Sequence, residues 1–154
     1  MEYELINIRT VMNKDEGGSG LSFVEAKHDI PFEIKRMYFI YKNEECMQMG
    51  FHPHKQSWHL FFCPNGRIDI TIDNGETCST ISLDDPSKGL ILHPGVWREI
   101  KWINNNSVLC VAASGHYEAF KYRKDYESYL KYVAEKKKTT NDEMADIWGE
   151  SIYE

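Results

Sequence analysis

Two histidines separated by one residue, His52 and His54, are the pair in this sequence best suited to chemistry. In a β-strand, residues two apart point to the same side, so both imidazoles would enter one space. Paired imidazoles can move protons near neutral pH, because histidine titrates there. They can also bind a metal ion, and His59 would then be a third nitrogen ligand. Proton transfer and metal binding both remain open on these residues alone.

The elements that must position these histidines have the pattern of β-strands. Short β-prone runs cover residues 5–8, 21–26, 34–41, 59–63, 67–73, 78–83, 89–92, 99–103 and 108–113. The sequences Pro64-Asn65-Gly66 and Asn74-Gly75 between them are typical of tight turns. Polar and apolar residues alternate in 67–73, which predicts one wet and one buried face. Many short strands without intervening helices predict an all-β sandwich or barrel.

The chain changes character after Gly115. Tyr122, Tyr126, Tyr129 and Val133 recur at helical spacing, which predicts a C-terminal helix with an aromatic face. We therefore expect one domain over residues 1–135, comprising a β-barrel and this helix, followed by a charged tail over 136–154.

Composition excludes several classes of protein. A formal net charge of −6 over 154 residues disfavours general nucleic-acid binding, which usually requires a basic excess. No apolar run is long enough to span a bilayer, and no signal peptide is visible, so we expect a cytoplasmic protein without membrane contact. The four cysteines show no C-x-x-C spacing, and Cys63 and Cys110 lie in apolar runs typical of buried thiols.

Two segments together resemble the paired motifs of the cupin superfamily. Residues 52–66 have the order His-x-His, four residues, a third histidine at His59, six residues and Gly66. Residues 89–98 resemble the second cupin motif, although Arg98 stands where that motif usually closes on a histidine. The resemblance implies an all-β fold: a single small cupin, a jelly-roll-like antiparallel β-barrel with a C-terminal α-helix.

A narrower resemblance, over roughly residues 4–132, is to the nucleotide-sugar 3,4-ketoisomerases, the WxcM-like family. It rests on Ile30-Pro31-Phe32-x-Ile34-Lys35-Arg36-x-Tyr38, Gly50-Phe51-His52-x-His54-Lys55, the turn with Pro94 and Trp97, and Val111-Ala112-Ala113-Ser114 followed by Tyr117. The resemblance implies a homodimer that isomerises a dTDP-4-keto-6-deoxyhexose without a metal or other cofactor, in deoxysugar and polysaccharide biosynthesis.

The resemblance also implies a role for each site residue. His52 and His54 would be the catalytic acid/base pair. The residues that would bind the nucleotide-sugar substrate are Arg36, Tyr38, His59, Trp97 and Arg98. Arg98 could stabilise an enediolate, and Arg36 could hold a diphosphate through two hydrogen bonds.

The proposed reaction suits two imidazoles. A proton alpha to the 4-keto group must leave C3, and a proton must return at C4. Two other interpretations remain. The chain could be a cupin that binds sugar nucleotides without catalysis, or a metal-dependent cupin that uses His52, His54 and His59. A fixed cation at Arg98 argues against the metal, because it would repel the ion.

Overall fold

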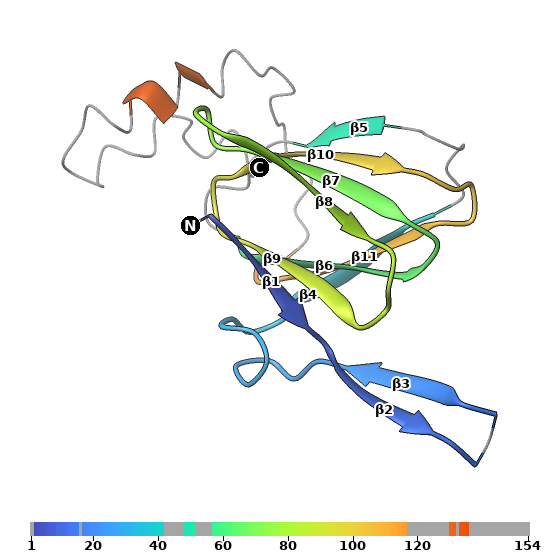
Figure 1. Cartoon of the computed structure of the whole chain (residues 1–154). Helices are drawn as coiled ribbons and strands as arrows, with labels where there is room; N and C mark the ends of the chain where they lie inside the picture. Colours follow the sequence, from blue (N-terminus) through green and yellow to red (C-terminus); the bar gives the residue numbers. More distant parts are fainter. Residues whose placement is uncertain are drawn as a thin grey trace.

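Two antiparallel sheets face each other and enclose the core (Figure 1). The structure is a computed structural model that describes residues 2–15, 17–41, 48–51, 57–116, 130–131 and 133–135, with the backbone alone for 48–51. The larger sheet has the order β1 (Tyr3–Asn7), β9 (Lys88–Leu92), β6 (His59–Asn65), β11 (Val108–Ala113) and β4 (Arg36–Ile40). The smaller sheet has the order β5 (Gln48–Phe51), β10 (Trp97–Trp102), β7 (Ile68–Asp73) and β8 (Cys78–Leu83). This arrangement confirms the predicted small cupin-like β fold.

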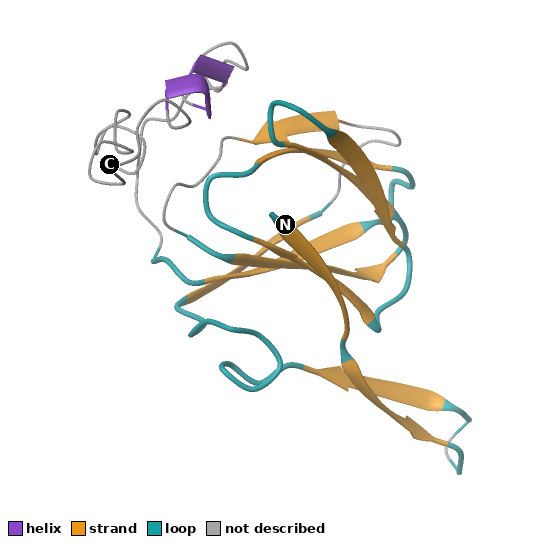
Figure 2. Cartoon of the chain, turned by 60° about the vertical axis from the view of Figure 1, so that its left-hand side comes forward, coloured by secondary structure: helices purple, strands orange, loops and turns teal. Residues whose placement is uncertain are grey.

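A separate hairpin extends away from the two sheets (Figures 1 and 2). It consists of β2 (Arg9–Asn13) and β3 (Ser19–Phe23), paired antiparallel. The sequence pattern predicted a strand over 21–26 and none over β2. Both strands of the hairpin lie largely in solvent, so neither shows the alternation of buried and exposed residues that identifies a strand.

The alternation predicted in residues 67–73 is confirmed in β7. Ile68, Ile70 and Ile72 are buried, whereas the residues between them are partly exposed. The buried side chains join a core cluster that lies between the sheets and contains Phe61, Cys63, Ile68, Ile70, Ile72, Leu83, Leu90, Leu92, Val96, Ile100, Trp102, Leu109 and Val111. Burial of each large apolar side chain contributes about 1.5–3 kcal/mol, so this cluster supplies much of the stability of the barrel.

A second cluster covers the outer face of the larger sheet. Ile30 and Phe32, from the segment between β3 and β4, pack on Leu60, Ile91 and Ala112 of that sheet. The segment is therefore a cover, and the strands beneath it are buried on both faces.

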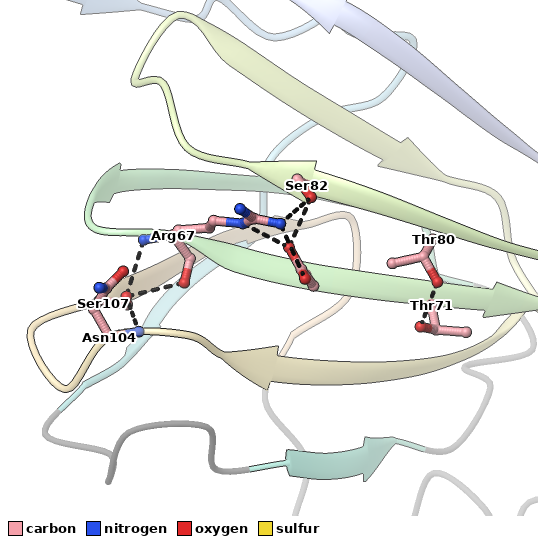
Figure 3. A network of polar contacts seen from close by, with 7 residues as sticks. Arg67, Thr71, Thr80, Ser82, Asn104 and Ser107 are labelled. Atoms are coloured by element: carbon pink, nitrogen blue, oxygen red, sulfur yellow. Dashed lines mark hydrogen bonds and ion pairs between the residues drawn. The ribbon is translucent and has the colours of Figure 1, made fainter.

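The turn after β6 is fixed by a glycine and a buried serine. Gly66 has a φ of 84°, and a Cβ there would lie 2.6 Å from Ser107 Cα, so the position requires glycine. The Ser107 hydroxyl accepts hydrogen bonds from the backbone N–H groups of Arg67 and Asn104 and donates one to the Arg67 carbonyl (Figure 3). This contact joins the β6–β7 turn to the loop between β10 and β11.

The C-terminal helix is described only in part. Residues 130, 131 and 133–135 are helical, and the side chains of Leu130 and Val133 lie against Gly75 in the β7–β8 turn. Tyr122, Tyr126 and Tyr129 of the predicted aromatic face, and the tail 136–154, lie outside the described residues. In the described part of the chain, no helix has the length and apolar character needed to cross a membrane.

Asp29 fastens the covering segment to the hairpin through Arg9 of β2. Its carboxylate accepts a hydrogen bond from Arg9 at 2.7 Å and one from the Glu25 backbone N–H at 2.7 Å. The hydrogen bond from Arg9, followed by the backbone bond, holds the pKa of Asp29 well below its usual range. The ionised form therefore stabilises the fold above about pH 4, and this stabilisation is lost as the pH falls through the depressed pKa.

Asp29→Asn should lower the midpoint of urea unfolding at pH 7, and the difference from the wild type should become smaller at pH 3, because below about pH 4 the unfolded chain binds a proton at Asp29 that the folded protein does not. Asp15→Asn, which removes an exposed carboxylate, is the control and should shift the midpoint little. An Asp29→Asn deficit that is equally large at pH 7 and at pH 3 would contradict this assignment.

Candidate active site

Strand register brings predicted site residues together at one end of the barrel. Arg36 of β4 pairs with Ala113 of β11, which pairs with His59 of β6. One step further into the barrel, Tyr38 pairs with Val111, which pairs with Phe61. Directly paired residues point to the same side of the sheet, so each set of three paired residues forms a row across β4, β11 and β6. In each row, a smaller residue of β11 lies between two large side chains.

Arg98 enters the same space from the opposite sheet. Its side chain is only 1% exposed, although arginine is rarely buried to this degree. Its guanidinium carbon lies 5.6 Å from the centre of the Phe61 ring, a cation–π distance. Its charge also acts on the Tyr38 phenol, and its Nη1 lies 3.4 Å from the Val96 carbonyl oxygen. Arg98 therefore links the two sheets through the interior.

Tyr38 lies between two positive charges. The Arg36 guanidinium lies over its ring, 5.0 Å from the centre. Burial raises the pKa of the Tyr38 phenol, and the nearby charges of Arg98 and Arg36 offset part of that increase. Tyr38 is therefore a neutral phenol at physiological pH, with a hydroxyl that can donate a hydrogen bond to a ligand oxygen.

His59 is fully buried, with both ring nitrogens inaccessible to solvent. Its ring centre lies 6.1 Å from that of Phe61, at an angle of 47°. The imidazole thus lies on one side of Phe61, and the Arg98 guanidinium contacts the same ring. His59 is a residue of the barrel interior rather than of its surface.

Trp97 is not brought together with these residues. Along β10, Arg98, Ile100 and Trp102 share one face, and Ile100 and Trp102 belong to the central core. Trp97 has the opposite parity and so lies on the outer face of the smaller sheet, where it is buried. Contact between Trp97 and a substrate stays a prediction.

His52 and His54 lie outside the described residues, so their proposed roles stay predictions. The backbone nevertheless relates them to the site: β5 ends at Phe51, which pairs with Arg98, and His52 follows directly in the sequence. The three-histidine metal set also remains untested, because two of its members are these residues. Within the described ranges, no group of three His, Cys, Asp or Glu side chains could hold a metal ion.

Sequence reasoning missed Phe61, Val111 and Ala113 as parts of the site. Phe61 contacts both Arg98 and His59, and the two β11 residues separate the larger side chains of each row. Counting every second residue from His59 would have found Phe61, because alternate strand residues share a face. The positions in β11 depend on strand pairing between distant segments, which the local sequence does not reveal.

The neutral state of Tyr38 can be tested directly. Ionisation of tyrosine is followed by absorbance at 295 nm, and the titration of Tyr38→Phe is subtracted from that of the wild type. The difference should appear only above pH 10, because burial raises this pKa. Tyr41→Phe removes an exposed tyrosine and serves as the matched reference. A Tyr38 signal below pH 10 would contradict the assignment.

Comparison with known proteins identifies the family. A family model described as FdtA, WxcM-like, C-terminal, matches residues 1–134. A TDP-4-oxo-6-deoxy-alpha-D-glucose-3,4-oxoisomerase from Aneurinibacillus thermoaerophilus is 35% identical over 134 residues, 87% of this chain and 94% of that protein. The structure of the sugar 3,4-ketoisomerase QdtA from Thermoanaerobacterium thermosaccharolyticum, in complex with TDP, has a TM-score of 0.80 and 34% identity, covering 88% of this chain and 96% of that one.

A mutant of the same Thermoanaerobacterium enzyme, in complex with TDP-4-keto-6-deoxyglucose, has a TM-score of 0.79 at 34% identity and covers 91% of this chain and 98% of that one. The family model matches residues 1–134, and the Aneurinibacillus protein is 35% identical over nearly its whole length, so the family assignment is secure. The chain belongs to the FdtA family of WxcM-like proteins.

Proposed function

We propose that this protein is a nucleotide-sugar 3,4-ketoisomerase that acts on a TDP-linked 4-keto-6-deoxyhexose in deoxysugar biosynthesis. The observation that carries the proposal is the gathering of Arg98, Tyr38, His59 and Arg36 at one end of the barrel, beside the strand end that His52 follows. The family relatives isomerise or bind TDP-4-keto sugars, so the site and the family support the same reaction.

The barrel interior suits an enediolate intermediate. Removal of the C3 proton leaves negative charge on the carbonyl oxygen, and the reaction is fast only if that charge is stabilised. The Arg98 guanidinium is a fixed cation in a site from which water is largely excluded, and the neutral Tyr38 hydroxyl is a second donor. We assign the proton transfers between C3, C4 and the two oxygens to His52 and His54.

Arg36 is suited to the diphosphate of the substrate. Its Nε is buried and has no hydrogen-bond partner among the described residues, whereas most buried donors have one. A guanidinium can bind phosphate oxygens through two parallel hydrogen bonds. We therefore assign Arg36 to the nucleotide end of the substrate and Arg98 to the sugar end.

The experiment that tests the function is solvent exchange followed by NMR. The protein is incubated with dTDP-4-keto-6-deoxyglucose in deuterated water without added metal, and positions C3 and C4 are observed. We expect deuterium incorporation and a 3-keto product. Tight binding without exchange would favour a non-catalytic binder, and turnover that requires added Fe(II) and is abolished by a chelator would favour a metal-dependent cupin.

The catalytic assignment is tested with His54→Asn and the matched control His116→Asn, which changes an exposed histidine. We expect His54→Asn to lower kcat by at least about 100-fold, because general acid–base catalysis contributes about 10²–10⁴-fold. His116→Asn should retain wild-type activity. Full activity of His54→Asn, with an unchanged circular dichroism spectrum, would refute the role.

We also propose that the protein is a homodimer. Val11, Met12 and Leu21 of the projecting hairpin are more than half exposed, as is Phe39 on edge strand β4. Apolar side chains grouped on exposed strands, and an unpaired strand edge, favour association with a partner. A second copy of the chain is the occupant that the family resemblance supports.

Phe39→Glu should shift the mass measured by light scattering towards that of the monomer, because a carboxylate cannot be buried against an apolar partner without a large cost. The control Thr80→Glu, on the exposed face of β8, should leave the mass unchanged. A monomeric wild-type protein would refute the homodimer directly.

We further propose a cytoplasmic location. The described cysteines Cys63, Cys78 and Cys110 are free thiols, which is the usual state in a reducing compartment. Burial raises the pKa of Cys63, and it raises that of Cys110 to about 11, so both thiols are protonated and unreactive at neutral pH.

A further inference from the structure

We propose that Phe61 and Tyr38 are positioning residues: together they hold the Arg98 guanidinium in the one orientation that the reaction uses. The inference rests on the proposed isomerase function, because the role of Arg98 in the reaction depends on it. It adds a residue, Phe61, that carries no acid, base or charge of its own.

The register of three strands sets up this arrangement. Tyr38 and Phe61 both pair with Val111, one from each side, so their rings flank β11. Strands pair about 4.8 Å apart, which places the two backbones roughly 10 Å from each other. Val111 is the smaller residue between them, which leaves room above β11 for a planar group.

Arg98 fills that room from the opposite sheet. Its guanidinium carbon lies 5.6 Å from the centre of the Phe61 ring, and Tyr38 flanks β11 on the other side. The ring face of Phe61 attracts the cation, and the Tyr38 phenol is close enough to feel its charge. The Phe61 ring on one side and the Tyr38 side chain on the other restrict the position of the guanidinium.

This restriction matters because arginine has a long, flexible side chain. A cation stabilises developing charge in proportion to how well it is already oriented, and a displacement of about 1 Å can cost roughly 100-fold in rate. Phe61 also contacts the His59 ring, so the same residue packs against both the imidazole and the cation. A smaller apolar residue at position 61 would keep the core apolar but would release both groups.

The first test is kinetic and uses Phe61→Leu with Phe32→Leu as the matched control. Both phenylalanines are buried, but Phe32 packs on the outer face of the larger sheet and does not contact Arg98. We expect Phe61→Leu to lower kcat about tenfold and to leave KM and the Kd for TDP within about twofold, because the nucleotide end of the site is intact. Phe32→Leu should lose thermal stability to a similar extent while retaining kcat.

The second test is chemical rescue. Arg98→Ala should lose most activity, and guanidinium ion at millimolar concentration should restore it several-fold by occupying the space between Phe61 and Tyr38. Adding Phe61→Leu to Arg98→Ala should abolish rescue, whereas adding Phe32→Leu should not. If Arg98→Ala fails to fold, Arg98→Lys replaces it, with kcat as the readout: Lys keeps the charge without the planar group and should also lose activity.

The outcomes separate the two proposals. Absence of turnover by the wild-type protein would overturn the isomerase function and this inference with it. Wild-type turnover with equal kcat in Phe61→Leu and Phe32→Leu, or equal rescue in both double variants, would overturn the positioning role alone. A selective loss of kcat and of rescue in the Phe61→Leu background would support it.

Discussion

A positive charge enclosed in an apolar barrel is the constraint on which the rest of this site depends. Arg98 is 1% exposed and lies among side chains of the central core. Removing an ion from water costs several kcal/mol even after the protein relaxes around it, so contacts within the protein must compensate for the lost hydration. Here the contacts that the structure describes are the face of the Phe61 ring and the carbonyl oxygen of Val96, with the Tyr38 phenol nearby.

The residues around Arg98 are brought together by the pairing of strands rather than by proximity in the sequence. β11 lies between β6 and β4, and its small and medium side chains separate the larger ones that those neighbours direct inward. The same rows place the residues assigned to the sugar end one step deeper than Arg36. The pleat of the sheet therefore sets the depth of each group along the barrel, and no loop is needed to hold the described part of the site.

Alternation and turn chemistry were sufficient to predict the fold class and several strands from the sequence. Cys78–Leu83 and Val108–Ala113 match their predicted bounds, and Asn74-Gly75 lies in the turn between β7 and β8, as its conformational preferences indicate. The buried state of Cys63 and Cys110 was also predicted correctly from their apolar surroundings.

Two features could not be predicted, and a third was expected from the resemblance alone, for physical reasons. The hairpin strand β2 has no buried face, so no periodicity identifies it. The inward direction of Arg98 runs against the usual preference of arginine for solvent, and it was expected only from the resemblance of residues 89–98 to the second cupin motif. The role of Phe61 depends on contacts between strands from distant parts of the chain, which a single sequence does not specify.

The alternation of inward and outward side chains along strand β4 restricts how the sequence of this protein can evolve. Within five residues it alternates Arg36 and Tyr38, which face the site, with Met37 and Phe39, which face outward. Substitutions of Arg36 or Tyr38 can therefore alter ligand recognition, and substitutions of Met37 or Phe39 can alter self-association, independently of each other. Insertion or deletion of a single residue would exchange the two sets, burying the outward pair and expelling the phenol and the guanidinium from the barrel. The length of this strand is thus more tightly constrained than the identity of any one residue in it.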